Sequence, residues 1–181
     1  TGHYRLLVDP GTYSVLYSRS DCVTQQKNGI VVLDASTTIV DVTLTTTKTS
    51  WNAATDYSTG VNPGFDWTYG YRSLDFSGSL TPYDVNNNVG AFELYEWSSS
   101  DATSRGWISY NANATALEVP WGIWWDPHGI NMHPGGLGDR PTRRWTSPLS
   151  GWVDVAAAFK GMDPGGTTSD CHILVNDDRV W

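Results

Sequence analysis

The sequence predicts an all-β fold, and three observations support this prediction. Apolar and β-branched residues recur at every second position in short runs, for example GTYSVLYS at 11–18 and GWISYN at 106–111. Clusters of Gly, Pro, Asn and Asp separate these runs and supply turn chemistry. Only the run at 153–160 is compatible with a helix, and it alternates equally well as a strand. Short strands between turns are typical of β-sandwiches and jelly rolls.

The first 47 residues predict a small antiparallel β unit. Its expected strands are HYRLLV, GTYSVLYS, NGIVVLD and STTIVDVTLTTT, at 3–8, 11–18, 28–34 and 36–47. Turns are expected at Asp9-Pro10-Gly11 and at Lys27-Asn28-Gly29, because Gly accepts a positive φ. The polar run Thr45–Ser50 marks the domain boundary, so we place a first domain at 1–47 and a second at 48–181.

Three segments of the first unit match a known module. They are Gly2-His3-Tyr4-Arg5 as a G-x-Y strand opening, Pro10-Gly11-Thr12-Tyr13 as a P-G-x-Y turn and strand, and Val40-Asp41-Val42-Thr43-Leu44 as a closing strand. With these segments the unit resembles the carboxypeptidase regulatory-like module, an immunoglobulin-like β-sandwich of many secreted bacterial proteins. The resemblance implies a partial sandwich without the one or two strands that normally precede the G-x-Y segment. An open sheet edge of this kind invites pairing with another strand.

Residues beyond 50 predict loops that alternate with short strands. A loop leads into a first strand within 51–73, and a strand at 117–126 is interrupted by Pro120, which suits an edge or a bulge. The other expected strands are GAFELYEWSSS, RGWISYN, RRWTSP, GWVDVAAAFKGMD and CHILVNDDRVW. The second part is therefore also predicted to be an all-β sandwich or jelly roll.

A second resemblance covers most of this part. Its motifs are Asp56-Tyr57-Ser58, Asn62-Pro63, Trp67-Thr68-Tyr69-Gly70-Tyr71, Leu94-Tyr95, Met132-His133-Pro134-Gly135, Arg144-Trp145-Thr146-Ser147-Pro148, Thr168-Ser169-Asp170 and His172-Ile173-Leu174-Val175-Asn176. They resemble a jelly-roll module that recurs in secreted bacterial proteins and is grouped loosely with carbohydrate-binding modules. The resemblance implies a jelly-roll β-sandwich over 48–181, with further strands beyond the L-V-N segment. Both ends are therefore expected to continue in a longer protein, or to be completed by strands of neighbouring subunits.

Composition excludes several classes of partner. The net charge is −8 and no Lys/Arg cluster occurs, so the chain lacks the basic face that nucleic acids require. No apolar run approaches the roughly 18 residues of a transmembrane helix, and no membrane insertion is expected. Abundant Thr, Ser, Asn and Gly and the sequon Asn113-Ala114-Thr115 favour an extracellular or cell-surface location. Cys22 and Cys171 are expected as unpaired buried thiols, with a disulfide between them as the alternative.

The sequence offers no pattern for catalysis, and we predict a protein that is not an enzyme, without catalytic residues or a metal site. No spacing singles out a pair of carboxylates, and no nucleophile or phosphate-binding motif occurs. The nearest approach to a metal site is the set His128, His133, Asp170 and His172, for which hydrogen-bonded framework roles are the preferred interpretation. No cofactor is expected, and structural calcium near Asp163 and Asp177-Asp178 is kept as an alternative.

The aromatic-rich stretch at 117–148 is the predicted binding region. Flat indole rings offer wide apolar surfaces with few rotatable bonds, so stacking on them costs little entropy. The predicted ligand-binding residues are Trp121, Trp124, Trp125, Asp126, His128 and Asn131, with Trp107 and Tyr110 as second candidates. Along a strand Trp124 and Trp125 face oppositely, so at most one of them joins the ligand face. The alternative is that these tryptophans fill a sandwich core.

Two functions follow from these expectations. The first is an extracellular, non-catalytic β-sandwich module that binds carbohydrate or another surface polymer. The alternative is a structural or adhesive subunit of a cell-surface assembly or filament, held by strand exchange through edge strands between subunits. Aromatic residues clustered in one stretch favour the first function, and incomplete strand sets favour self-association.

Overall fold

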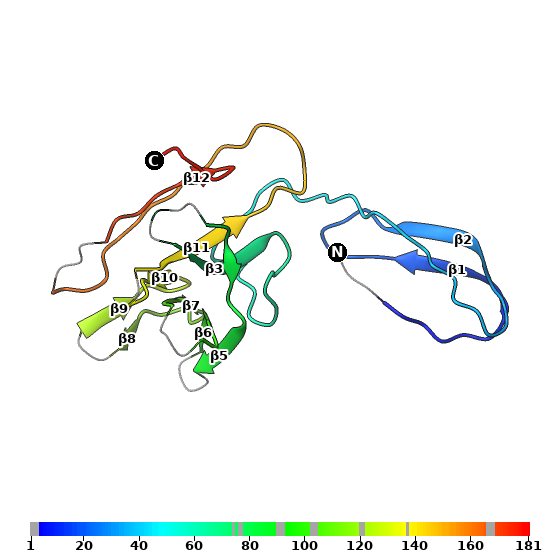
Figure 1. Cartoon of the computed structure of the whole chain (residues 1–181), viewed down its shortest axis with the longest axis horizontal. Coiled ribbons are helices and arrows are strands. Elements are labelled where there is room, and N and C mark those ends of the chain that lie inside the picture. The colour runs from blue at the N-terminus through cyan, green and yellow to red at the C-terminus, as the bar shows by residue number, and fades with distance from the viewer. Residues whose placement is uncertain are drawn as a thin grey trace. The chain divides into compact units, whose positions relative to one another are not determined.

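The computed structural model describes residues 4–73, 75, 78–89, 93–101, 105–119, 122–136, 138–165 and 169–181. All of its named elements are β-strands (Figure 1), so the predicted all-β fold class is confirmed. They are β1 Gly11–Tyr17, β2 Gln25–Val32, β3 Trp67–Arg72, β4 Thr81–Pro82, β5 Val85–Val89, β6 Leu94–Ser98, β7 Trp107–Asn111, β8 Leu117–Val119, β9 Ile123–Trp125, β10 Ile130–His133, β11 Arg140–Trp145, β12 Leu174–Val175 and β13 Asp178–Arg179. The described residues form no helix with the length and hydropathy of a membrane span. The chain divides into two compact units, Thr1–Trp51 and Asn52–Trp181.

In the first unit β1 and β2 pair antiparallel, with a shift of register between Tyr13 and Val15. At this shift Asn28 and Gly29 of β2 lie opposite the single residue Ser14 of β1, which is the arrangement of a β-bulge. Gly29 has a φ of 71°, a conformation that Gly adopts at no steric cost. The turn predicted at 27–29 is therefore wrong, because the positive φ serves a bulge inside β2 and does not reverse the chain.

The first unit contains no buried side chain among its described residues. Within the predicted strands at 3–8 and 36–47, the described residues are assigned no strand beyond a single bridge of Thr46. The backbone bonds that join 45–47 to 21–23 are too few to form a ladder. Apolar side chains of these segments are open, with 88 % of Leu7 and 82 % of Ile39 exposed. These two strand predictions are wrong over the described residues, because the segments lack a pairing partner along their length.

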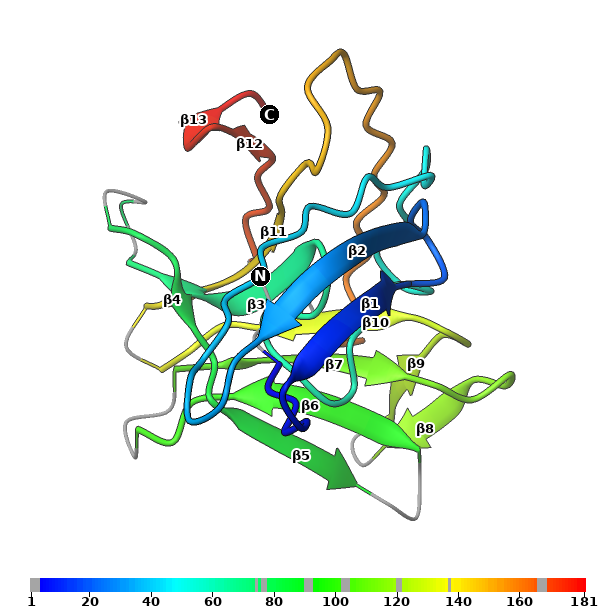
Figure 2. The same ribbon diagram turned by 90° about the vertical axis from the view of Figure 1, so that its right-hand side faces the viewer.

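The second unit contains two larger sheets (Figure 2). Their inward side chains contribute to a mainly aromatic core cluster. One sheet has the strand order β10-β7-β6-β5, and the other has the order β11-β3-β4. Side chains alternate across each strand, so Trp97 of β6 and Ile108 of β7 point inward together with Tyr69 of β3. Tyr69 and Ile108 have no exposed surface. Fully burying one such side chain stabilises the fold by roughly 1.5–3 kcal/mol.

The polar atoms of the core are paired. The Tyr57 hydroxyl donates to the Ile108 carbonyl at 3.0 Å. The Ser58 amide donates to the Tyr69 hydroxyl at 2.8 Å, and the Trp97 indole N–H donates to the Ser58 carbonyl at 2.7 Å. These bonds connect the loop before β3 to both sheets, so the loop is part of the core. Paired polar groups avoid the desolvation cost that unpaired buried groups carry.

Two segments of the second unit differ from the predicted strands. The segment predicted as one interrupted strand at 117–126 is a hairpin of β8 and β9. Pro120 and Trp121 lie between its strands, outside the described residues, and Gly122 follows with a φ of 76°. The segment 153–160 is assigned no strand, and all of its residues are exposed, although apolar and polar residue types alternate along it. Pairing decides both cases: residues 117–119 and 123–125 pair with each other, whereas 153–160 lies in no sheet.

Candidate functional site

The structure distributes the predicted binding residues over three consecutive elements. Trp124 and Trp125 lie on β9, Asp126 and His128 lie in the loop after it, Asn131 lies on β10, and Trp121 is outside the described residues. The residues therefore do not share one strand face, and each must be considered with its own neighbours.

The β8–β9 hairpin has one exposed side and one partly buried side. Glu118 lies opposite Trp124, and both are exposed, with 51 % of Trp124 accessible. Leu117 lies opposite Trp125, and both are partly buried. The Trp125 indole nitrogen is buried and has no hydrogen-bond partner among the described residues. Trp124 is thus available to a ligand, whereas Trp125 packs inward.

The loop after β9 adds charge beside Trp124. Asp126 is exposed, and its two carboxylate oxygens accept from the Lys160 ammonium at 3.1 and 3.3 Å. We name the surface of Glu118, Trp124 and Asp126 the hairpin face. It combines one open indole with hydrogen-bond acceptors, which is the chemistry that binds hydroxyl groups beside an apolar ring.

His128 is held by the body of the domain. It is exposed and has a φ of 53°, and its Nδ1 lies 3.3 Å from the Tyr110 hydroxyl. Tyr110 in turn stacks on the core residue Tyr57, with ring centroids 4.9 Å apart. His128 therefore fixes the loop against the core, and its ring is oriented by that contact.

Asn111, at the end of β7, organises the loop and the hairpin. Its side chain is fully buried, and the amide nitrogen lies 3.2 Å from the Thr115 carbonyl and 3.1 Å from the carbonyls of Trp125 and Asp126. Its amide oxygen accepts from the backbone and the side chain of Asn113, at 3.0 and 2.7 Å. One buried amide thus joins both ends of the segment that carries the hairpin face. Sequence reasoning missed this role.

Asn131 belongs to a different surface. On β10 it lies opposite Ser109 of β7, on the side of the sheet that faces away from the core. Its neighbour Ile130 packs against the core cluster, as strand alternation requires. Asn131 is therefore a residue of the outer sheet face and not of the hairpin face.

The arginines near Trp145 are structural. The Arg143 guanidinium carbon lies 4.1 Å from the centroid of the Trp67 ring and 5.3 Å from that of Tyr69. Burial lowers the pKa of Arg143 to about 10. Arg144 points to the opposite side and pairs with Asp177 at 3.1 Å. The two side chains face oppositely, as alternation along β11 requires, and neither forms an open anion site.

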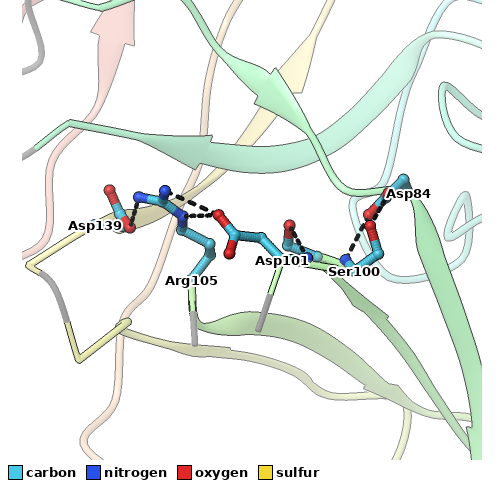
Figure 3. A network of polar contacts seen from close by, with 6 residues as sticks. Asp84, Ser100, Asp101, Arg105 and Asp139 are labelled. Carbon is cyan, nitrogen blue, oxygen red and sulfur yellow. Dashed lines mark hydrogen bonds and ion pairs between the residues drawn. The ribbon is translucent and has the colours of Figure 1, made fainter. Parts of the chain in front are cut away.

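A chain of polar contacts at one end of the sheets involves three carboxylates (Figure 3). Arg105 bridges Asp101 and Asp139 at 3.0 and 2.9 Å. Asp84 accepts from the backbone N–H of Ser100 at 2.8 Å and from its hydroxyl, and these bonds lower the pKa of Asp84. General acid catalysis needs a carboxyl whose pKa is raised. These carboxylates are charge-paired or hydrogen-bonded, so the network connects the loops that carry them.

The described residues contain no group of three or more His, Cys, Asp or Glu that could hold a metal ion. Two of the carboxylates considered for structural calcium have partners within the protein. Asp177 pairs with Arg72 at 2.9 Å as well as with Arg144, and Asp163 accepts from the Gly165 amide at 2.7 Å.

His133 and His172 make hydrogen bonds, in line with the framework roles expected for them. His133 Nδ1 lies 2.8 Å from the Pro134 carbonyl, and His172 Nε2 lies 2.7 Å from the Asp170 carboxylate. Cys22 and Cys171 lie in different units, and both are partly exposed. The expectation of buried thiols is therefore wrong for both cysteines, and the unit of Cys22 buries no described side chain at all.

A comparison with family models, with curated proteins and with solved structures finds no match for this chain. The geometry of the molecule is therefore the basis of the functional argument.

Proposed function

We propose that the chain is an extracellular, non-catalytic module that binds carbohydrate or another hydroxyl-rich surface polymer. The observation that carries this proposal is the half-exposed Trp124 ring on a paired strand, flanked by Glu118 and Asp126. An exposed large ring on a hairpin held by buried hydrogen bonds loses little entropy on binding. The same proposal includes an immunoglobulin-like topology for 1–47 and a jelly-roll topology for 48–181.

A fluorescence titration with a panel of soluble glycans tests this proposal. Loss of stacking on one ring removes about 1.4 kcal/mol, so Trp124→Ala should weaken binding roughly tenfold. Trp152→Ala is the matched control, because Trp152 is fully exposed in a segment that belongs to no sheet. If Trp124→Ala and the unchanged chain bound the glycans with equal affinity, the hairpin face would not be part of the binding surface.

A second candidate function is a structural subunit that shares strands with its neighbours. Specific features favour it: residues 151–162 are extended and outside any sheet, and their exposed apolar side chains include Trp152, Val153, Val155 and Phe159. Unpaired extended backbone with open apolar side chains is a template for another strand. Light scattering on the purified chain tests this candidate. Concentration-dependent assemblies would support it, and a monodisperse monomer would contradict it.

A further inference from the structure

The outer face of the four-stranded sheet carries a continuous row of polar side chains. Strand alternation places Trp97 and Ile108 on the core side, so their sequence neighbours lie on the opposite side. The register aligns one residue from each strand across the sheet, and these residues are Asn87, Glu96, Ser109 and Asn131. Three interstrand spacings of about 4.8 Å give this row a length of about 14 Å. Asn87, Glu96 and Asn131 are at least partly exposed in this row, and Ser109 is buried between Glu96 and Asn131.

Two stacked aromatic side chains lie beside this row. Trp107 of β7 and His133 of β10 are cross-strand neighbours on the same face, and Ser98 lies opposite Trp107 on β6. The Trp107 and His133 rings stack with centroids 3.8 Å apart and an interplanar angle of 5°. His133 therefore covers one side of the indole, while Trp107 remains partly exposed. A ring fixed by its neighbour presents its other side to a ligand at low entropic cost.

The polar side chains of the row are oriented in advance. The Asn87 amide donates to the Glu96 carboxylate and to the Ser98 hydroxyl, both at 3.2 Å. Ser109 is 1 % exposed, and its hydroxyl has no hydrogen-bond partner among the described residues. This oxygen lies in the row between Glu96 and Asn131. A buried hydroxyl without a partner costs free energy, so a hydrogen bond from a ligand hydroxyl that reaches it would remove that cost.

The charge of this surface selects its ligand. We name the sheet face the set of Asn87, Glu96, Ser98, Trp107, Ser109, Asn131 and His133. Glu96 is the one carboxylate of this set, and the set contains no Lys or Arg. Amides and hydroxyls both donate and accept, which matches the hydroxyl groups of a sugar. A carboxylate at the centre repels uronates and sulfated sugars.

We propose that the sheet face is a binding site for a neutral glycan, with one pyranose ring stacked on Trp107 and its hydroxyls bonded along the polar row. This inference rests on the proposed function and adds a second surface to it. The hairpin face belongs to the β8-β9 pair and the sheet face to the sheet β10-β7-β6-β5, so the two faces are tested by separate variants.

Isothermal titration of the full chain with neutral and acidic oligosaccharides tests this inference. The probes are cello-, manno- and chito-oligosaccharides, with oligogalacturonate as the anionic counterpart. Trp107→Ala should weaken binding of the neutral probe at least tenfold, and Asn131→Ala should weaken it three- to tenfold. Circular dichroism of each variant checks the fold, and Asn131→Ala keeps the test valid if Trp107→Ala does not fold. Glu96→Gln should raise the affinity for oligogalacturonate, and Trp152→Ala should bind as the unchanged chain does.

The outcomes separate this inference from the proposed function. If Trp107→Ala and Asn131→Ala bind normally while Trp124→Ala does not, the sheet-face site is refuted and the carbohydrate function stands. If no probe binds to the unchanged chain, both are refuted. If the unchanged chain forms dimers that Trp107→Ala abolishes, and no glycan binds, the sheet face is a protein interface and the inference is also overturned.

Discussion

Asn111→Ala should destabilise the second unit more than any exposed substitution in the same sheet. The Asn111 side chain has no exposed surface and makes its contacts with Thr115, Trp125, Asp126 and Asn113. Its two N–H groups and its oxygen together supply three or four hydrogen bonds, and each is worth about 1 kcal/mol net. The variant should therefore lose about 3 kcal/mol of unfolding free energy, which lowers Tm by about 10 °C for a domain of this size.

Urea unfolding followed by tryptophan fluorescence measures this loss. Asn86→Ala is the matched control, because Asn86 is exposed and donates one hydrogen bond, to the Thr59 carbonyl. The control should cost less than about 1 kcal/mol. Hydrogen exchange adds a local readout, since the amides of β8 and β9 should lose protection in Asn111→Ala before the core strands do. If Asn111→Ala lost no more free energy of unfolding than Asn86→Ala, the assignment of Asn111 as the residue that holds the hairpin in place would be refuted.

Two predictions concern pH. Burial raises the pKa of Tyr57, Tyr69 and Tyr83 above the ordinary 10.0, so the unfolded chain releases phenolic protons that the folded chain retains. The free energy of unfolding should fall as pH rises above 10, by up to about 1.4 kcal/mol per pH unit for each tyrosine, and ionisation of all tyrosines near pH 10 without unfolding would contradict this burial. The bonds from Ser100 lower the pKa of Asp84 below 3.8, so their contribution to stability is complete above pH 3.8 and is lost as pH falls through the folded-state pKa. Ser100→Ala should raise the pKa of Asp84 in an NMR titration, and an unchanged value would show that the hydroxyl is not its partner.

Sequence reasoning identified the fold class because alternation is a local property. The runs that became β1, β6 and β7 alternate over five to seven residues, and each pairs along its length with a neighbouring strand. The segment 153–160 alternates in the same way but lies in no sheet. Pairing is a long-range event that no local pattern records, and this explains the wrong strand predictions.

The candidate site was predictable only in part for a related reason. Strand alternation separated Trp124 from Trp125, and the structure places them on opposite sides of the hairpin. The role of Asn111 depends on carbonyl groups that the β8–β9 hairpin brings back to β7, so spacing could not reveal it. The sheet face depends on register across four strands, and among its residues the sequence pointed only to Asn131 as a predicted ligand-binding residue and to Trp107 as a second candidate.

Binding to a neutral-glycan array tests the central claim most directly. We expect the unchanged chain to be retained on neutral glycans and the double variant Trp107→Ala/Trp124→Ala not to be retained, although both fold. Absence of retention for the unchanged chain, or equal retention of the double variant, would contradict the claim that these two indoles form a carbohydrate-binding surface.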